Sequence, residues 1–194
     1  MRSASQDRWG SSSNGIEMFA EERAEQIHHA YLSLGSNIEP EKNLPAAVRE
    51  LERIGRVLLA SSVWQSPSLG GPDQPDYLNA ALLLETPMSA EYLKKEVIAA
   101  VESLLGRVRS GDRNAPRTID IDIILFDFEQ LRIGGRTIPD REVLERPFVA
   151  IPLAEIAPGY IHPVTGDSLA QIASRFDPIS WGMRIRADVI LKQD

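Results

Sequence analysis

The chain has 194 residues, which is enough for one domain with a substantial core and too few to favour two. Hydrophobic residues make up 43% and charged residues 25%, as in ordinary globular proteins, and the net charge of −7 argues against a general nucleic-acid binder. The absence of cysteine excludes disulfides, thiolate catalysis and cysteine-ligated metals, and the three scattered histidines argue against zinc. A bound metal would therefore need oxygen ligands, which favours Mg²⁺ or Mn²⁺.

Residues 1–28 differ in composition from the rest and are predicted to form a flexible extension, with residues 29–194 as the single folded domain. The segment 11–15 is rich in serine and glycine, and 16–27 is charged. No apolar run approaches a membrane span and no signal-peptide core is present at the amino terminus. We therefore expect a cytoplasmic protein without a membrane partner.

Apolar periodicity predicts the elements of the first half. A strand is expected at 30–35, a helix from about Asn43 that ends at Gly55, and strands at 57–66 and 77–85. Pro45 is expected in the first turn of the helix, because proline lacks the N–H that later turns require. The segment 67–75 is too rich in proline and glycine for a plain hairpin and could act as a lid.

The second half begins with a helix that Ser89 is expected to cap and Gly106 to end. A strand at 119–125 follows, then a hairpin at 130–138 that turns on Gly134 and Gly135. Helical or irregular structure is expected from 146, a short helix at 168–175 and a final strand at 184–191. This order predicts an α+β, ferredoxin-like sandwich, with a mainly antiparallel central sheet and helices over one face.

An arginine-rich loop leads into a strand that carries Asp120 and Asp122. The loop holds four arginines, Arg107, Arg109, Arg113 and Arg117. Apolar residues alternate with the aspartates, so both carboxylates should point the same way, with Cα atoms about 6.5–7 Å apart. Such a pair suits two Mg²⁺ ions about 3.5–4 Å apart, and guanidinium groups suit phosphate oxygens. Paired aspartates also occur on solvated strands, but the apolar opposite face and the arginines together favour a nucleotide site.

The strand at 77–85 carries an aromatic and an amide side chain on one face. Tyr77 and Asn79 could hold a flat heterocycle by stacking and paired hydrogen bonds. A sheet-surface tyrosine beside an incidental asparagine explains the pattern equally well, and Phe148 by itself is expected in the core.

Five collinear segments resemble the 6-hydroxymethyl-7,8-dihydropterin pyrophosphokinase family. They are residues 31–37, 73–79, 106–109, 116–122 and 145–149, within a resemblance that covers roughly residues 30–175. The family transfers a whole pyrophosphate from ATP to the hydroxymethyl group of the pterin, which yields AMP on the route to folate. The resemblance therefore implies an ATP-dependent diphosphotransferase.

The resemblance also implies roles for individual residues. Asp120 and Asp122 would bind two Mg²⁺ ions, and Arg107 and Arg117 would contact phosphate as catalytic residues. The residues implied for the pterin are Ser66, Leu69, Asn79 and the stacking pair Tyr77 and Phe148. Those implied for ATP are Arg107, Arg109, Arg117, Ile123, Thr137, Arg141 and Arg146. The segments 67–76 and 107–117 correspond to loops that close over both substrates, and no residue in the motifs is an obvious general base.

Two positions depart from the family pattern. Asn114 stands where many members have tryptophan, which removes or replaces one closing contact of the loop. Asp140 follows Pro139 where many members have a histidine that helps to bind ATP. An ionised aspartate cannot donate a hydrogen bond to phosphate, and Arg141 is the candidate to compensate.

Two other classes compete with this interpretation. A metal-dependent phosphohydrolase could use the same aspartates with water, but it leaves Tyr77, Asn79 and Phe148 without a role. A non-enzymatic ferredoxin-like module that binds RNA or a protein would need a basic or aromatic sheet, and the acidic balance speaks against it. We expect a monomer that acts on small molecules and binds no nucleic acid.

Overall fold

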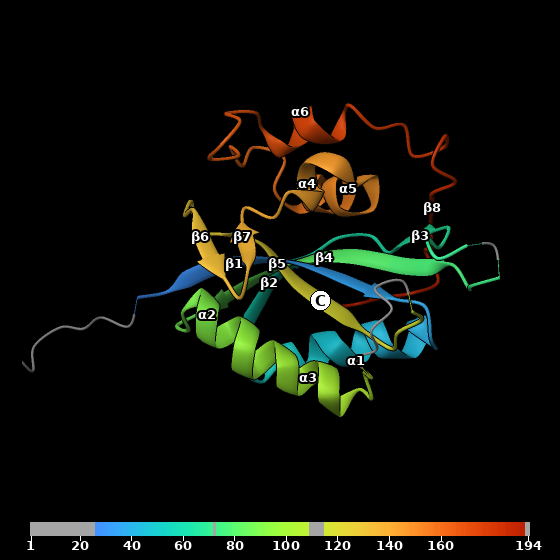
Figure 1. The fold of residues 1–194 in the computed structure, drawn as a ribbon, viewed down its shortest axis with the longest axis horizontal. Coiled ribbons are helices and arrows are strands. Elements are labelled where there is room, and N and C mark those ends of the chain that lie inside the picture. The colour runs from blue at the N-terminus through green and yellow to red at the C-terminus, as the bar shows by residue number, and fades with distance from the viewer. Residues whose placement is uncertain (1–25, 72, 109–114, 193–194) are drawn as a thin grey trace, which may run out of the picture.

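The computed structural model describes residues 26–71, 73–108 and 115–192. Their centre is a six-stranded sheet in the order β5-β1-β4-β3-β8, with β2 also paired to β4 (Figure 1). Every pairing in this sheet is antiparallel. The α+β class and the antiparallel sheet predicted from the sequence are therefore confirmed. Most of the predicted extension, residues 1–25, lies outside the described residues, and the first strand begins at His28.

The main sheet is built from strands of very different length. The long central strands are β1 (His28–Ser36), β4 (Tyr77–Thr86) and β5 (Asp120–Phe126). The shorter ones are β2 (Arg56–Ala60), β3 (Trp64–Ser66) and β8 (Arg184–Ile185). A separate hairpin is formed by β6 (Leu131–Ile133) and β7 (Arg136–Ile138). It turns on Gly134 and Gly135 as predicted, because both residues have the positive φ angles that glycine tolerates best.

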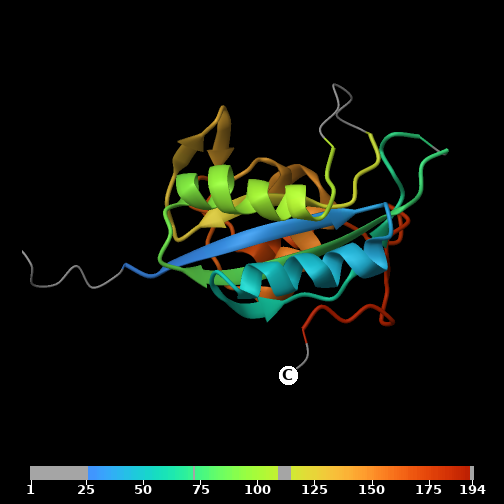
Figure 2. The ribbon, with the colours of Figure 1, turned by 90° about the horizontal axis from the view of Figure 1, so that it is seen from below.

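Helices cover both faces of the sheet, whereas the sequence led us to expect helices over one face only. One face carries α1 (Pro40–Glu52) and a continuous helical segment made of α2 (Ala90–Tyr92), the π-helical turn η2 (Leu93–Ile98) and α3 (Ala99–Leu104). These helices run side by side across the sheet (Figure 2). The opposite face carries α4 (Glu142–Glu145), α5 (Pro147–Ile156) and α6 (Leu169–Ala173) (Figure 1).

The sheet therefore separates two hydrophobic cores. The first joins β1, β4 and β5 to α1, η2 and α3, and its fully buried members include Leu44, Val48, Leu51, Leu93 and Ile121. The second joins Ile124 and Leu125 of β5 to Val149 and Leu153 of α5. Burial on both sides explains why the central part of β4 is an unbroken apolar run instead of an alternating one.

The positions of one proline and of two predicted strands differ from the sequence-based predictions. Pro45 lies inside α1, beyond its first turn, because the helix begins at Pro40. The missing hydrogen bond is tolerated where the apolar side of the helix packs against the sheet. The strand expected at 57–66 is split into β2 and β3, since the backbone of Ser61 bonds to Ala81 while residues 61–63 leave strand geometry. The strand expected at 184–191 is regular only at 184–185.

The helix caps follow the sequence closely. The Ser89 hydroxyl accepts a hydrogen bond from the Tyr92 N–H at 3.3 Å, as expected for the cap of the second long helix. Ser168 and Gln171 form a capping box at the start of α6. Among the described residues, no helix is both long and apolar enough to cross a membrane.

Candidate active site

The two aspartates of β5 lie on one face of the sheet, as the alternating pattern predicted. Asp120 and Asp122 are partly exposed, while Ile121 between them is fully buried in the core on the opposite face. The next residue on the aspartate face, Ile124, packs into the α5 core. Because β5 is the edge strand of the sheet, the two carboxylates stand at the rim of the molecule's central layer.

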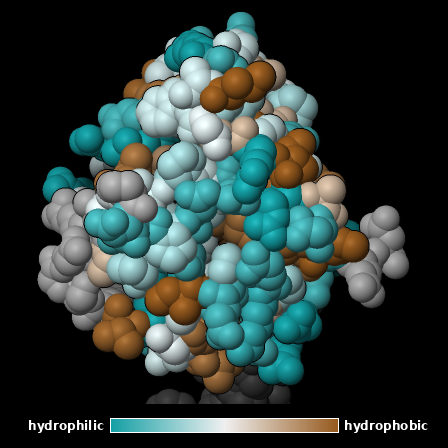
Figure 3. All heavy atoms as spheres, turned by 90° about the vertical axis from the view of Figure 1, so that its right-hand side faces the viewer, coloured by the Kyte–Doolittle hydropathy of each residue, from teal (hydrophilic) through white to brown (hydrophobic). Residues whose placement is uncertain are grey.

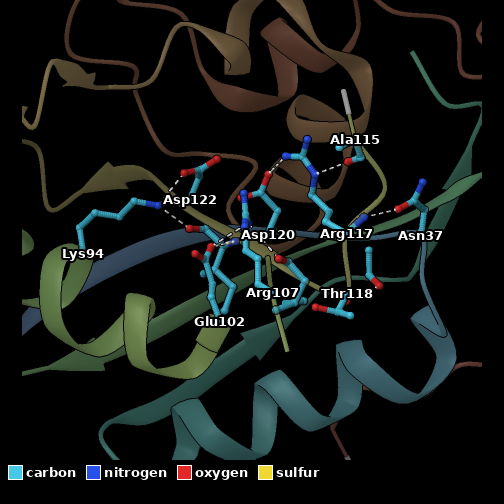
Figure 4. A network of polar contacts seen from close by, with 12 residues as sticks. Asn37, Lys94, Glu102, Arg107, Ala115, Arg117, Thr118, Asp120 and Asp122 are labelled. Carbon is cyan, nitrogen blue, oxygen red and sulfur yellow. Dashed lines mark hydrogen bonds and ion pairs between the residues drawn. The ribbon is translucent and has the colours of Figure 1, made fainter. Parts of the chain in front are cut away.

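Asp120 is held between two of the predicted arginines (Figure 4). Its carboxylate accepts hydrogen bonds from the guanidinium groups of Arg107 and Arg117, one on each oxygen. Arg107 also donates to the carbonyl of Ile119 at 2.9 Å and to Glu102 Oε1 at 2.9 Å. The structure therefore gathers the acidic and basic parts of the sequence motif into one cluster.

Asp122 is paired with two cations that the sequence motif did not contain. Lys94 Nζ lies 2.7 Å from Asp122 Oδ1, and Arg136 Nη1 lies 2.9 Å from the same oxygen. Burial by itself would raise the pKa of the Asp122 carboxyl, but Lys94 and Arg136 outweigh burial and hold the pKa below its usual range. Asp122 is therefore ionised at neutral pH and able to bind a cation.

Lys94 and Glu102 also form hydrogen bonds with backbone groups of the edge strand that no neighbouring strand pairs in the described part of the chain. Lys94 donates to the carbonyl of Ile121 at 2.6 Å, and Glu102 Oε1 accepts from the Ile121 N–H at 3.0 Å. Both side chains come from the helical segment that packs beneath β5 (Figure 4). These contacts fix the position of β5, and with it the spacing of the two aspartates.

Arg117 is positioned by the end of β1. Its backbone N–H donates to Asn37 Oδ1 at 2.8 Å, and its carbonyl accepts from the Asn37 N–H at 3.1 Å. Ser36 adds a hydrogen bond from its hydroxyl to the carbonyl of Thr118. The segment after β1 thus anchors the last part of the arginine-rich loop next to Asp120.

A cross-strand row connects the aspartates to the predicted heterocycle residues. Gly35 of β1 pairs with Asp120 of β5 on one side and with Asn79 of β4 on the other. Paired residues point to the same face, and two strand spacings separate the Cα atoms of Asn79 and Asp120 by about 10 Å. A Cβ atom at Gly35 would lie 3.4 Å from Asn79 Oδ1 and 3.8 Å from a Tyr77 ring carbon. Glycine therefore leaves the space between the two groups open.

Tyr77 belongs to the same neighbourhood as Arg117 and Asp120. Burial raises the pKa of the Tyr77 phenol, Arg117 acts in the opposite direction and Asp120 adds to the rise. The Tyr77 hydroxyl lies 3.5 Å from the carbonyl of Ala115. The aromatic residue expected to stack on a heterocycle thus borders the charged cluster.

Other residues predicted for the heterocycle line a separate cavity of about 370 Å³. It is bordered by residues 66–69, Phe148 and residues 180–183, so it brings Ser66, Leu69 and Phe148 together. Tyr77 and Asn79 do not line it, but the Asn79 amide donates to the Ser66 hydroxyl at 2.9 Å. One hydrogen bond therefore links the cavity wall to the cross-strand row.

The described residues predicted for the rest of the nucleotide lie on several elements. Ile123 is buried in the strand, Thr137 is exposed on β7, and Arg146 is partly buried at the start of α5. Arg141 is exposed, and its Nε lies 3.3 Å from Glu145. Arg109, like Arg113 and Asn114, lies outside the described residues.

Arg136, and not Arg141, lies beside the unusual Asp140. Arg136 Nη1 is 3.7 Å from Asp140 Oδ2, and Asp140 Oδ1 accepts from the Glu142 N–H at 3.0 Å. The Asp140 N–H donates to the carbonyl of Ile124 at 2.8 Å, which ties the residue to β5. Asp140 is therefore a buried structural acid whose neighbour Arg136 faces the aspartate cluster.

Three side chains of the cluster, Lys94, Glu102 and Arg136, were missed by the sequence analysis. Glu102 is polar in an otherwise apolar helical stripe, and that conflict with the pattern could have revealed it. Lys94 gave no such signal, because the π-helical turn at 93–98 changes the helical register. Arg136 sits in a short hairpin whose docking against β5 is not visible in the sequence.

The carboxylates fit Mg²⁺ that is shared with a substrate. Among the described residues, no group of three or more histidine, aspartate or glutamate side chains could hold a metal by itself. Mg²⁺ is commonly bound by one or two carboxylates together with water and substrate phosphates. Two neighbouring carboxylates that remain partly exposed offer such a donor set, and the surrounding cations offer partners for the phosphates.

Comparisons with known proteins point to a single family. The family model described as 7,8-dihydro-6-hydroxymethylpterin-pyrophosphokinase (HPPK) matches residues 31–158. The 2-amino-4-hydroxy-6-hydroxymethyldihydropteridine pyrophosphokinase of Synechocystis is 34% identical over 83% of this chain and 85% of its own length. Its counterpart in Methylorubrum extorquens is 38% identical over 77% of this chain and 94% of its own.

A solved structure supports the fold. The crystal structure of wild-type Plasmodium falciparum HPPK-DHPS with SDX-DHP superposes with a TM-score of 0.59 at 13% sequence identity. The match covers 77% of this chain and 44% of that chain, so this protein spans less than half of the solved polypeptide.

Proposed function

Because the chain belongs to the 7,8-dihydro-6-hydroxymethylpterin-pyrophosphokinase family, it is a pyrophosphokinase of folate biosynthesis, and we propose that its two substrates meet across Gly35. The enzyme transfers pyrophosphate from ATP to the hydroxymethyl group of 6-hydroxymethyl-7,8-dihydropterin. The observation that carries the proposal is the row Asn79–Gly35–Asp120, which puts the amide proposed to read the heterocycle and the acid proposed to bind metal on one face.

Asp120 and Asp122 are the proposed ligands of two Mg²⁺ ions. Bound there, the ions would offset the charge of the triphosphate and polarise its oxygens. Two carboxylates of one strand, each paired with basic side chains, support this assignment. The donor pair and the reaction class support the proposal of two ions.

The arginines around the aspartates are also proposed to bind the phosphate oxygens of ATP. Arg107 and Arg117 contact Asp120, and Arg136 contacts Asp122. We propose that these side chains turn from carboxylate to phosphate oxygens when ATP binds, since bidentate arginine contacts suit both groups. Arg146, Arg141, Arg109, Ile123 and Thr137 remain proposed contacts to the rest of the nucleotide.

The chemical step needs position and charge compensation more than proton chemistry. The hydroxymethyl oxygen attacks the β-phosphorus, the bond from that phosphorus to the α,β-bridging oxygen breaks, and AMP leaves. The hydroxyl proton is released in the same step. The cationic cluster stabilises the charge that develops on the transferred group, and the sheet holds the alcohol in line.

The pterin is proposed to lie at the β3–β4 end of the sheet. Asn79 would read the amide edge, and Tyr77 and Phe148 would stack on the ring. The hydrogen bond between Asn79 and Ser66 supports this arrangement, since it holds the amide beside the cavity that Phe148 and Leu69 border.

We also propose that the enzyme acts as a monomer in the cytoplasm. The absence of cysteine suits a reducing compartment.

One assay tests the proposed function directly. Purified protein is incubated with MgATP, with and without the pterin alcohol, and AMP and phosphate are quantified. Pterin-dependent AMP is the expected result. Phosphate release that does not depend on pterin would instead identify a hydrolase, and no turnover of either kind would favour a binding module.

A further inference from the structure

The chain beyond α6 crosses the end of the sheet and returns to the first core. After α6 it forms a turn at 177–182, adds β8 to β3, and ends with Val189 and Leu191 buried against the α1 side. This C-terminal strap, residues 177–191, lies outside the part of the chain that the family model matches. Figure 3 shows the face that carries it, where separate apolar patches interrupt a mostly hydrophilic surface.

The strap supplies one wall of the cavity next to the pterin residues. Residues 180–183 line this cavity of about 370 Å³ together with residues 66–69 and Phe148. That volume is at the small end of the range for ligand pockets. Trp181 is 40% exposed and Met183 is 6% exposed, so an indole and a thioether line the cavity together with the Phe148 ring.

The wall is held in place by contacts within the strap and with the 66–69 loop. Gly182 has a φ of 64°, and a Cβ there would lie 3.1 Å from the Pro67 ring, so the strap approaches the 66–69 loop at a glycine. The Met183 N–H donates to the carbonyl of Pro178 at 2.8 Å. The Trp181 ring meets Phe176 edge to face at a centroid distance of 6.4 Å.

Arg186 anchors the strap beyond the cavity. Its guanidinium group contacts Asp188 at 2.8 Å, Glu41 of α1 at 3.0 Å and the side chain of Gln65 at 3.2 Å. Its backbone N–H donates to the carbonyl of Val63 at 2.8 Å. The strap is therefore fixed to β3, the strand that leads directly into the 66–69 loop.

We infer that Trp181 is a pterin-binding residue and that the strap sets the size of the pterin pocket. The inference rests on the proposed function, and it adds a contact from a segment outside the matched family region. An indole at the cavity rim can pack against a flat bicyclic ring, and a fixed wall limits how large a substituent the ring can carry. Trp181 thereby contributes to substrate selection, not to the chemistry at phosphorus.

The test compares Trp181→Ala and Trp181→Leu with the wild-type enzyme. We expect KM for the pterin to rise about tenfold in both, as for the loss of one stacking contact, while KM for ATP stays unchanged. Trp181→Phe should show a smaller rise, because it keeps an aromatic ring. Phe128→Ala is the matched control, since Phe128 is an exposed aromatic residue that does not line the cavity.

Thermal unfolding establishes which variants are folded at the assay temperature. A folded Trp181→Ala or Trp181→Leu enzyme with the wild-type KM for pterin would overturn the inference and leave the proposed function intact. In the wild-type protein, pterin binding should also quench the fluorescence of the Trp181 indole, a contribution that is missing in Trp181→Phe. Equal quenching of tryptophan fluorescence in both proteins would overturn the inference as well. Absence of pterin-dependent AMP in the wild type would instead refute the proposed function.

Discussion

Replacing Asp122 with asparagine tests the role of the aspartate pair most directly. Asn has nearly the same shape, so the change removes charge while keeping most of the packing. Removing a preorganised electrostatic contact of this kind costs about 3–4 kcal/mol in the transition state, which corresponds to a fall in kcat of about 10²–10³-fold. We expect a loss of that size in AMP formation from saturating MgATP and pterin.

The same substitution should affect stability far less than turnover. Asp122 accepts from Lys94 at 2.7 Å and lies 2.9 Å from Arg136, and hydrogen bonds to charged groups contribute about 1.5–3 kcal/mol each. Lys94 and Asp122 keep 24% and 17% of their side chains exposed, and Asn retains an acceptor oxygen. We therefore expect unfolding in urea to reveal a loss of only about 1–2 kcal/mol.

Asp127→Asn is the matched control for this experiment. Asp127 follows the same strand, lies 2.6 Å from a His28 ring nitrogen and accepts from the His29 N–H at 2.7 Å, away from the aspartate pair. Its φ of 45° is one that asparagine tolerates. The control should lose some stability and keep its turnover. A turnover of Asp122→Asn equal to that of Asp127→Asn would refute the metal assignment.

Further substitutions test the positioning of β5, the binding of ATP, the space between the two substrates and the pH dependence of stability. Glu102→Gln should lower kcat about tenfold and lower the melting temperature, because Glu102 is buried and supports both an arginine and the β5 backbone; unchanged values of both would contradict that role. Arg136→Met should raise KM for ATP about tenfold, and equal KM values in Arg136→Met and the exposed Arg132→Met would argue against a phosphate contact. Gly35→Val should fold but lose activity by filling the space between the substrates, whereas an active Val enzyme would show that they do not meet there. Burial holds the pKa of His162 below its usual range, so an unfolded chain binds the proton first and stability falls as the pH drops below about 6.5; His162→Gln should reduce that fall in urea unfolding, and an unchanged pH profile would exclude His162 as its source.

The sequence was most informative where one local rule decided the outcome. Period-two alternation located β5 and the common face of Asp120 and Asp122, and paired glycines located the β6–β7 turn. Ser89 and Ser168 marked helix starts because their hydroxyls satisfy free N–H groups. These features depend on residues that are neighbours in the chain.

Features that depend on distant contacts could not be predicted. The pairing of Lys94 with Asp122 requires the helical segment to cross beneath the edge of the sheet, and no periodicity encodes that crossing. The short length of β8 likewise depends on where β3 ends, because β3 offers only a few residues for pairing. Helices on both faces of the sheet were missed because α5 is apolar nearly all round, which hides the direction that it faces.

The side chains that form hydrogen bonds with the Ile121 backbone affect the tendency of the protein to aggregate at high concentration. An outer strand normally offers its unpaired amide and carbonyl groups to any passing chain, which invites intermolecular β-association. Here the Ile121 N–H donates to the Glu102 side chain, and the Ile121 carbonyl accepts from Lys94. The carbonyl of Ile124 accepts from the backbone N–H of Asp140. The outer side of the edge strand β5 can therefore remain unpaired by another strand, and accessible to the proposed substrates, without promoting intermolecular β-sheet formation.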